Sequence, residues 1–453
     1  MLRADTGSLA GHASCSDSDL PLKGIRVLEL GQLIAGPFAG QLLGKATDDH
    51  LPIRPPNLTW DPLRVWRELD VDGTSPWWRS IGRNKKSVAI DLRKDEGRDL
   101  IRKLAIKSDV LLENFKPGTL EKWTLGPSDL HLHNPSLIFT RVSGYGQTGP
   151  WAQRPGYASV CEAESGFRFI NGYPDEEKGG EGLAGAPVRP NISLGDSVAG
   201  LHAAFGTVLA LLSRQRQVYS GLSPPKGKTV DVSIVESMLS LMEGIIPEYD
   251  RKGKIRGPSG SSVTGIVPTN AYPCLPSNMS SASSPKLLPS QEYEYVVIGG
   301  NGDSIYTRLM HAIARPDLVG PNYAQNQHRV ARQHEIEKAI SEWTKRRTVE
   351  EVVRVMMQAG VPVGRVNSVK EVLGNEQVVA RGAVREVKVG SKGKEEEGWN
   401  VKMQGTFPVI DGVDPQPVWA GPDLGAHTDL VLSEELELTR GEIERLRKDG
   451  VIG

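Results

Sequence analysis

One acidic residue of the chain lies where it could act as a nucleophile. Asp196 follows Gly195 at the end of residues 185–195 and precedes residues 197–212, an apolar run rich in small residues that is typical of a helix. Free backbone N–H groups and the helix dipole hold a carboxylate ionised at the start of a helix. The pattern predicts an N-cap at a strand-to-helix junction. It leaves open whether Asp196 is only a cap or also a reactive carboxylate.

The composition bounds the class of protein. The chain has 453 residues, enough for two or three domains of ordinary size. Its 54 basic and 55 acidic residues give a formal net charge of -1, so we expect neither nucleic acid nor a membrane as a partner. The longest apolar runs are shorter than about 20 residues, so no membrane span is predicted. We expect an intracellular protein, cytoplasmic or mitochondrial, without a clear targeting signal.

The sequence shows no pattern for a metal, a disulfide framework or a bound nucleotide. The three cysteines, Cys15, Cys161 and Cys274, are widely spaced and odd in number. There is no H-E-x-x-H motif and no P-loop, and the glycine-rich residues 143–150 have the wrong spacing for a dinucleotide fingerprint. We therefore expect no metal site and no permanently bound cofactor.

Alternating strands and helices in the first half of the chain predict an α/β fold. Four segments are predicted to be buried strands: residues 23–30, 87–92, 109–114 and 136–142. Residues 95–106 have the spacing of an amphipathic helix between two of them. This order favours a parallel sheet covered on both faces. Ligands of such sheets bind at the carboxyl ends of the strands, where residues 31–37, 113–118 and 143–150 would meet.

Shifts in composition predict the domain boundaries. Residues 1–20 are rich in Ser, Asp and Gly and are predicted to be disordered. Residues 385–408 are predicted to form a β-hairpin with a solvated charged turn at 392–397. The rest divides into a large domain at 21–216, a linker and connecting helix at 217–292, a smaller α+β domain at 293–370, and a C-terminal part at 371–453 that returns to the large domain.

Seven motifs in order along the chain carry a resemblance to a known family. They lie at residues 27–37, 83–92, 109–118, 143–146, 194–197, 360–364 and 421–429. With this content and order the chain resembles the class III coenzyme A transferases (the CaiB/BaiF type), which include formyl-CoA:oxalate, carnitine and succinate:dicarboxylate CoA-transferases. The resemblance implies a Rossmann-like large domain built from both ends of the chain, a smaller inserted domain, and an interlocked homodimer.

The resemblance also implies a role for Asp196, which falls on the family's nucleophilic aspartate. A carboxylate can attack a thioester carbonyl to form a mixed anhydride, and the released CoA thiolate then yields an aspartyl-CoA thioester that a second acid attacks. Water has to be excluded because anhydrides hydrolyse. The implied activity is transfer of CoA from an acyl-CoA thioester to a small carboxylic acid. Similarity to the succinate:dicarboxylate branch implies succinyl-CoA as donor and a dicarboxylate as acceptor.

The family's CoA site can be carried over residue by residue. The resemblance places Ala35, through its backbone, and Ile90, Arg93, Asn114, Phe115, Lys122 and Arg154 against CoA. Arg and Lys side chains suit the phosphates of the 3′-phospho-ADP group. For Arg93 and Lys122 the alternative is that each is an ordinary exposed surface cation.

Two other functions and one structural departure stay open. The α-methylacyl-CoA racemases, a side branch of the family, have a histidine where this chain has Tyr157, whose ordinary acidity suits proton transfer poorly. Glu162 and Glu164 are expected on a solvated or salt-bridged helix face rather than as replacement bases. A non-catalytic CoA-binding relative is the third alternative. It depends on Pro52, which falls within the family's second strand and predicts a shortened or divergent strand there.

Overall fold

The computed structural model describes most of the chain and divides it into two compact units. The described residues are 20–44, 49–54, 61–175, 177, 182–277, 293–391, 394–411, 413 and 419–453. The first unit comprises Met1–Phe167, Pro190–Glu243 and Glu376–Gly453, and the second comprises Arg168–Arg189 and Gly244–Asn375. The predicted disordered segment, apart from its last residue, and the start of the predicted charged turn at 392–393 lie outside the described residues.

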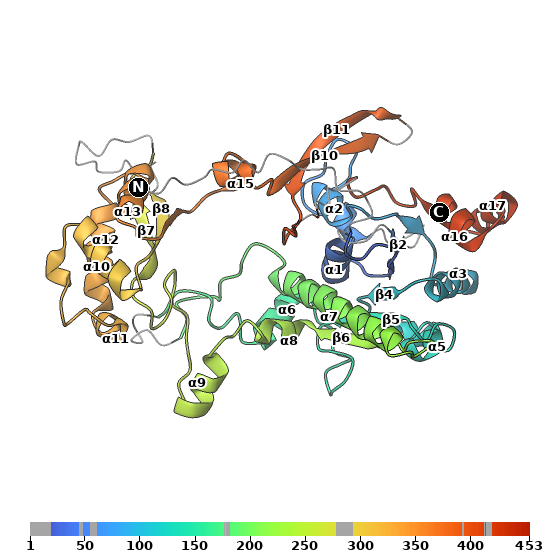
Figure 1. Ribbon diagram of the computed structural model, residues 1–453, viewed down its shortest axis with the longest axis horizontal. Coiled ribbons are helices and arrows are strands. Elements are labelled where there is room, and N and C mark those ends of the chain that lie inside the picture. Colours follow the sequence, from blue (N-terminus) through green and yellow to red (C-terminus); the bar gives the residue numbers. More distant parts are fainter. Residues whose placement is uncertain are drawn as a thin grey trace. The chain divides into compact units, whose positions relative to one another are not determined.

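A six-stranded parallel sheet forms the centre of the first unit (Figure 1). Its strands are β1 (Arg26–Glu29), β2 (Asp49–Arg54), β3 (Val88–Ala89), β4 (Val110–Glu113), β5 (Ile138–Ser143) and β6 (Thr229–Ser233). They lie in the order β3-β2-β1-β4-β5-β6, with every neighbouring pair parallel. The order changes direction between β1 and β4, and this switch point is where open α/β sheets bind ligands.

Helices cover both faces of the sheet because strand side chains alternate between two cores. Leu111 and Phe139 belong to one core, and their neighbours Val110 and Ile138 belong to the other. The first core also takes side chains from α3 (Asp95–Ile106), α4 (Thr119–Lys122), α5 (Pro127–His131), α16 (Thr428–Leu436) and α17 (Arg440–Lys448). The second takes them from α1 (Ala35–Leu43), α6 (Ala158–Glu164), α7 (Leu194–Tyr219) and α8 (Ile234–Leu239). The α/β fold predicted from the sequence is confirmed.

The strand that Pro52 made doubtful is present. β2 is six residues long, and Pro52 lies opposite Glu29 of β1. β2 pairs with β1 up to Pro52 and with β3 only through the two residues after it, Ile53 and Arg54. A proline has no N–H to donate to a sheet ladder. The change of partner at Pro52 therefore accommodates it without ending the strand.

The C-terminal segment packs onto the first unit beside β3. Ile452 forms an antiparallel bridge with Ile90. The Ser87 N–H donates to Nδ1 of His427 at 3.1 Å, and the Ala89 N–H donates to the Thr428 hydroxyl at 3.0 Å. Further elements of this unit are η2 (Pro62–Arg64), α2 (Pro76–Ile81), α15 (Glu376–Ala380) and the antiparallel hairpin of β10 (Val384–Ser391) and β11 (Lys394–Gln404). The C-terminal contacts fix the backbone on both sides of β3.

The second unit has a small antiparallel sheet packed against helices. Its strands are β7 (Thr269–Cys274), β8 (Glu294–Gly299) and β9 (Val363–Arg365), in that order. Its helical elements are α9 (Ile245–Lys252), α10 (Asp303–Ala312), η4 (Pro316–Leu318), α11 (Asn326–Val330), α12 (Gln333–Thr344), α13 (Val349–Gln358) and α14 (Val369–Leu373). The observed boundaries differ from those expected, because residues 168–189 belong to this unit while residues 217–243, expected as linker, carry β6 and α8 of the first.

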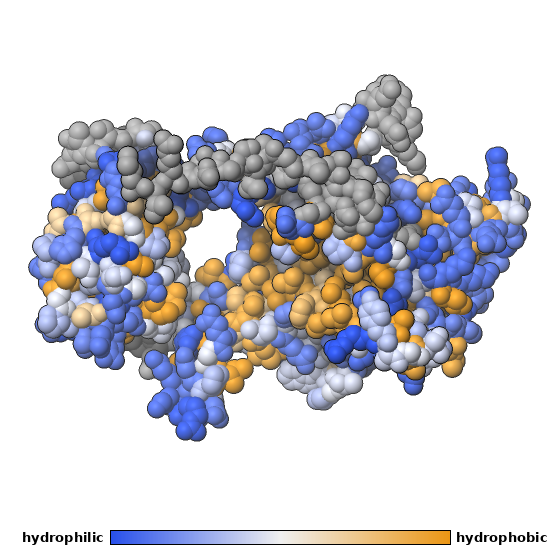
Figure 2. Space-filling view, in the orientation of Figure 1, coloured by the Kyte–Doolittle hydropathy of each residue, from blue (hydrophilic) through white to orange (hydrophobic). Residues whose placement is uncertain are grey.

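The helix α7 has two different faces. It is long and apolar enough to cross a membrane by length and composition alone. Its small residues Ala199 and Ala203 are buried in the core beneath it, and it lies across β5 and β6 as a core helix does (Figure 1). On its other side Leu201, Phe205 and Leu212 are exposed, and Figure 2 shows hydrophobic side chains gathered over this helix.

Candidate active site

Asp196 lies in the first turn of α7. The N-cap is Ser193, whose own side chain makes no capping hydrogen bond. Residues 182–193 are irregular, so the predicted strand-to-helix N-cap at Asp196 is wrong. The electrostatic argument survives, because the backbone N–H groups and the dipole stabilise a carboxylate anywhere in a first turn. Asp196 is partly buried, which leaves its carboxylate within reach of a ligand.

A buried glutamate fixes the turn that carries Asp196. Glu162 of α6 is fully buried, and its Oε1 accepts the Gly195 N–H at 3.1 Å. A Cβ at Gly195 would lie 3.3 Å from the Glu162 side chain, so the glycine permits this close packing. The expected solvated face is therefore wrong for Glu162, because the Gly195 amide supplies the partner that a buried carboxylate requires. Glu164 is salt-bridged as expected, to Arg154 at 2.8 Å.

The loop after β5 meets the start of α7 at Cys161. The Cys161 thiol contacts the Gly144 carbonyl oxygen at 3.5 Å. Burial raises the pKa of this thiol to about 11, and the charges of Asp196 and Glu164 add to the rise. The thiol therefore stays protonated and is a poor nucleophile. The Tyr145 hydroxyl in the same loop is buried and has no hydrogen-bond partner among the described residues.

Asn114 joins the two loops that flank the switch point of the sheet. It directly follows β4, and its side chain accepts the Gln32 N–H at 2.7 Å and donates to the Gln32 carbonyl at 2.8 Å. A Cβ at Gly31 would lie 3.0 Å from Oδ1 of Asn114, and one at Gly36 would lie 3.2 Å from its Cγ. The two glycines let the amide reach the backbone between them. Asn114 thus positions the loop between β1 and α1.

The same loop and the first turn of α1 are each held at one further point. Oδ1 of the buried Asp61 accepts the Leu33 N–H at 3.1 Å. Nζ of Lys85 donates to the Pro37 carbonyl and to Oε2 of Glu29, both at 2.8 Å, and the Lys85 and Glu29 side chains are fully buried. Leu33 has φ of 59°, a left-handed conformation that is unfavourable for leucine. Such strain persists where surrounding contacts hold it and is common at functional sites.

The start of α1 touches α7 one turn beyond Asp196. A Cβ at Gly200 would lie 2.7 Å from the Ala35 carbonyl oxygen and 3.2 Å from the Ala39 nitrogen, so the glycine lets the two helices touch. Gly200 is four residues after Asp196, and such residues share one face of a helix. Asp196 therefore lies on the side of α7 that faces Ala35 and the loop held by Asn114.

A buried ion network lies at the end of β4. Glu113 accepts the Phe115 N–H and Nε of Arg141, both at 2.6 Å. Arg141 also pairs with Glu121 of α4 at 2.5 Å. Burial raises the pKa of Glu113 to about 7, and Arg141 opposes this shift. The network fixes Phe115 and the short helix that ends at Lys122.

The remaining residues predicted to bind CoA differ in what they can offer. Ile90 is fully buried in the core and presents no exposed surface to a ligand in this structure. Arg93 is about half exposed and pairs with Asp91 through Nε at 2.8 Å and a terminal nitrogen at 2.6 Å. Lys122 is exposed. Arg154, besides its pairing with Glu164, lies over the Trp151 ring at 4.6 Å from its centroid.

These residues share one edge of the sheet because all its strands are parallel. Ala35 follows β1, Arg93 follows β3, Asn114 follows β4 and Arg154 follows β5. From β3 to β5 there are four strand spacings, or about 19 Å at about 4.8 Å each. A ligand that reaches from one end to the other has to be elongated. Among the described residues no group of His, Cys, Asp and Glu could hold a metal ion.

Comparison with known proteins identifies the family. The sequence model of CoA-transferase family III matches residues 22–428. The chain is 38% identical over 433 residues to the succinyl-CoA–D-citramalate CoA-transferase of Chloroflexus aurantiacus, covering 95% of this chain and 98% of that protein. It is 29% identical to the succinyl-CoA:glutarate CoA-transferase of Homo sapiens, with 95% and 90% covered. The crystal structure of a CAIB/BAIF family protein from Brucella suis superposes with a TM-score of 0.72 at 26% identity, covering 92% of this chain and 99% of that one. The chain therefore belongs to CoA-transferase family III.

Proposed function

We propose that this CoA-transferase moves CoA from succinyl-CoA to a small dicarboxylate through a covalent intermediate on Asp196. The observation that carries the proposal is the packing of α7 against α1 at Gly200 and Ala35, one turn from Asp196, which supports a position of Asp196 on the face of α7 toward α1. The succinyl-CoA donor is inferred from the relatives, whose names specify succinyl-CoA with citramalate or glutarate.

The reaction proceeds by exchange of acyl groups on Asp196. Its carboxylate attacks the thioester carbon of succinyl-CoA, the C–S bond breaks, and a succinyl-aspartyl anhydride and CoA thiolate form. The thiolate attacks the Asp196 carboxyl carbon, which releases succinate and leaves an aspartyl-CoA thioester. The acceptor carboxylate attacks this thioester to give a second anhydride and free thiolate. The thiolate then attacks the acceptor's acyl carbon, so the new acyl-CoA leaves and the Asp196 carboxylate is regenerated.

The chain's own residues orient this chemistry. Glu162 holds the Gly195 amide and thereby the turn that carries the nucleophile. The dipole of α7 favours negative charge in its first turn, where Asp196 lies. The buried Tyr145 hydroxyl is a donor that a substrate oxygen can use, since no described residue bonds it. Positioning of this kind supplies much of the rate enhancement, because each step needs the attacking group and the acyl carbon held in a fixed orientation.

CoA is proposed to lie along the carboxyl edge of the sheet. The first turn of α1, which has no side-chain cap among the described residues, offers the Ala35 backbone to the thioester end. Phe115 packs edge to face with Trp123, their centroids 5.7 Å apart, and borders the path. Arg93, Lys122 and Arg154 are the cations proposed for the phosphates. Arg93 would have to exchange or share Asp91 to contact a phosphate.

The exposed side of α7 supports the proposed homodimer. Leu201, Phe205, Val208, Leu209 and Leu212 are exposed and follow helical spacing, so they form one apolar stripe (Figure 2). Contiguous apolar surface of this kind marks an interface on a water-soluble protein. A second copy of the chain is the occupant that the family resemblance implies. Sedimentation of the purified protein as a monomer at micromolar concentration would contradict the dimer.

The function is tested by transfer assays on the purified chain. Wild-type protein is incubated with succinyl-CoA and a panel of citramalate, malate, glutarate and acetate, and new thioesters are identified by mass spectrometry. The variant Asp196→Asn removes the nucleophile and keeps the size of the side chain. The matched control is Asp95→Asn, which removes a carboxylate from the first turn of α3.

We expect transfer to one or more dicarboxylates but not to acetate, abolished by Asp196→Asn and unchanged by Asp95→Asn. Full transfer by Asp196→Asn would overturn the mechanism. Epimerisation of a 2-methylacyl-CoA without transfer would establish the racemase alternative. Binding of CoA with no reaction on any substrate would favour a non-catalytic relative.

A further inference from the structure

The second unit contains a pocket that has no part in the proposed reaction. It has a volume of about 440 Å³ and lies among the residues after α10 and the facing sides of α12 and α13. All its lining residues belong to the second unit. A volume of this size is within the range of small-molecule sites, about 300–1,000 Å³.

Four arginines line this arginine pocket: Arg315, the neighbouring Arg346 and Arg347, and Arg354. Arg315 is engaged with Asp317, through Nε at 2.9 Å and a terminal nitrogen at 2.6 Å. Arg347 donates to the Trp343 carbonyl at 2.8 Å. The side chains of Arg346 and Arg354 form no hydrogen bond or ion pair with any residue that the structure describes. Two guanidinium groups at the pocket are therefore available to an external anion.

The pocket carries excess positive charge. Its lining includes two carboxylates, Glu342 and Glu351, against the four guanidinium groups. The Glu351 carboxylate is also the partner of the Thr348 N–H at 3.0 Å, where it caps α13. Burial lowers the pKa of Arg347, Glu351 opposes this shift, and the neighbouring Arg346 lowers the pKa further. Like charges thus crowd one another here, and a bound anion would relieve the repulsion.

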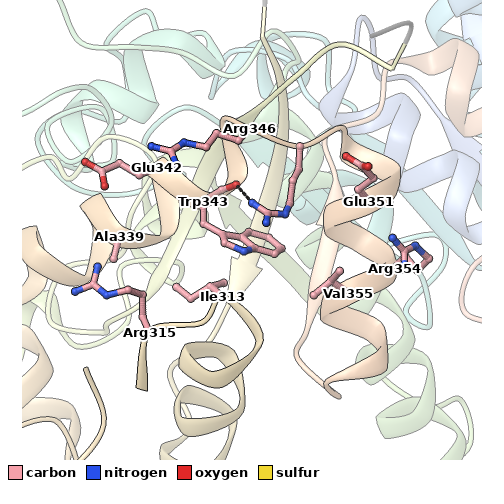
Figure 3. Close-up of a pocket in the computed structure, with 10 residues that line it drawn as sticks. Ile313, Arg315, Ala339, Glu342, Trp343, Arg346, Glu351, Arg354 and Val355 are labelled. Atoms are coloured by element: carbon pink, nitrogen blue, oxygen red, sulfur yellow. Dashed lines mark hydrogen bonds between the residues drawn. The ribbon is translucent and has the colours of Figure 1, made fainter. Parts of the chain in front are cut away.

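An aromatic and apolar wall lies beside the charges. Figure 3 shows the Trp343 ring in the centre of the pocket, with Ile313 and Val355 beside it and Arg346 and Arg354 toward the rim. The Arg347 guanidinium stacks over the ring at 4.1 Å from its centroid. Guanidinium groups recognise phosphate through paired hydrogen bonds, and an indole with aliphatic neighbours suits a flat or apolar body.

We propose that the arginine pocket binds a small polyanion with a planar body, of the nucleoside polyphosphate type. Its phosphates contact Arg346 and Arg354, and its base packs against the wall formed by Trp343, Ile313 and Val355. None of the residues that line the pocket takes part in the proposed transfer, and Asp196 belongs to the first unit. The binding site therefore stands independently of the proposed transfer reaction.

The proposal is tested by calorimetric titration of the full chain with ATP, with inorganic tripolyphosphate and with citrate. The pocket variant is Arg346→Ala/Arg354→Ala. Its matched control is Arg251→Ala/Lys338→Ala, which removes two exposed positive charges from the same unit outside the pocket. Because a nucleotide could also enter the CoA site of the first unit, the difference between the two double variants reports on the pocket alone.

We expect ATP to bind more tightly than tripolyphosphate or citrate, and its affinity to fall at least about tenfold in the pocket variant but not in the control. Tryptophan fluorescence should change on ATP binding in the wild type and not in Trp343→Phe. Equal ATP affinity in the pocket variant and the control would overturn the site. Equal affinities for ATP and tripolyphosphate would overturn the planar body. A conservative variant, Arg354→Gln, repeats the test if circular dichroism shows that the double variant is unfolded.

Discussion

The carboxyl edge of the parallel sheet and the arginine pocket of the second unit use polar side chains in opposite ways. At the sheet edge Asn114, Asp61, Lys85 and Glu113 are engaged with backbone or with one another. In the pocket Arg346 and Arg354 have no partner within the described ranges. At the sheet edge the polar side chains hold the protein backbone in place, whereas in the pocket two positive charges stay available to a ligand.

The difference shows what each region contributes to binding. Where side chains are satisfied internally, they hold the loop backbone and the proposed nucleophile in place, and the proposed ligand would contact mainly those. Where guanidinium groups lack partners, the ligand has to supply the counter-charge. Substitution should therefore destabilise the fold at the sheet edge, while in the pocket it should weaken binding and leave the fold intact.

The largest effect on stability is expected at Lys85. Lys85→Met leaves the buried Glu29 carboxylate without its counter-charge, and the free energy of unfolding should fall by about 3–5 kcal/mol in urea denaturation. Arg440→Met, which breaks the exposed pair with Glu444, should change it by less than about 1 kcal/mol. The double variant Lys85→Met/Glu29→Leu should recover much of the loss. If Lys85→Met alone lowered the free energy of unfolding by less than about 1 kcal/mol, the sheet edge would not differ from the arginine pocket in its contribution to stability.

Asn114 links stability to activity. Asn114→Ala removes two hydrogen bonds to Gln32 and should lower the free energy of unfolding by about 1–3 kcal/mol. Because the start of α1 loses its support, kcat/KM for CoA transfer should also fall at least about tenfold. The control Asn400→Ala alters an exposed residue of β11 and should do neither. Loss of stability with unchanged kcat/KM would show that the loop does not position the substrate.

His427 lies in the unit whose polar side chains are paired internally, and its burial should make the free energy of unfolding depend on pH. Burial lowers its pKa below the ordinary value of 6.5, and the neutral ring accepts the Ser87 N–H. The unfolded chain takes up a proton below about pH 6.5, whereas the folded protein resists it. The His427 contribution should be complete above pH 6.5 and be lost as the pH falls from there through the lower pKa of the folded state.

The measurement for His427 is the free energy of unfolding between pH 5 and 8, compared with His427→Asn. The difference between the two proteins should shrink toward acid pH. His133→Asn, at an exposed position, should leave the pH profile of the wild type unchanged. A difference that grows toward acid pH would contradict the assigned direction of the pKa shift.

The smallest effect on stability is expected in the arginine pocket. Arg346→Ala/Arg354→Ala should change the free energy of unfolding by no more than about 0.5 kcal/mol, because both side chains are exposed and no described residue pairs with either. Relief of the repulsion on Arg347 makes a small gain the expected sign. Thermal unfolding of the variant and the wild type in parallel measures this. A fall of the free energy of unfolding by more than about 1 kcal/mol would show that the two arginine side chains support the fold, as the paired side chains at the sheet edge do.

The sequence predicted the elements whose pattern is local. Alternating strands and helices gave the parallel sheet, and the apolar run after Asp196 gave α7. Partners distant in the chain were not visible. Glu162 is buried because the Gly195 amide, 33 residues away, bonds it, and a single glutamate on a helix carries no such signal. Pro52 is tolerated because β2 changes partner there.

The candidate site shows the same division. The motif order identified Asn114 as a CoA-site residue, but its two bonds to Gln32 required the fold. Ile90 was placed against CoA by resemblance, but the whole residue is buried in the core, which the motif could not show. The arginine pocket draws on residues after α10 and on two helices within residues 313–355, and only the packing of those helices brings its arginines around Trp343. The sequence did carry one signal of the Asn114 contact. Gly31 and Gly36 lie in the motif at residues 27–37, and glycines there could have indicated that another part of the chain approaches this backbone closely.

The central claim is that Asp196 carries the transferred group, and hydroxylamine trapping tests it most directly. Wild-type protein is mixed with succinyl-CoA and hydroxylamine without an acceptor acid, digested, and examined by peptide mass spectrometry. The account predicts a hydroxamate on Asp196 that depends on succinyl-CoA and is absent from Asp196→Asn. CoA transfer by the same preparation with no modification of the Asp196 peptide would contradict it.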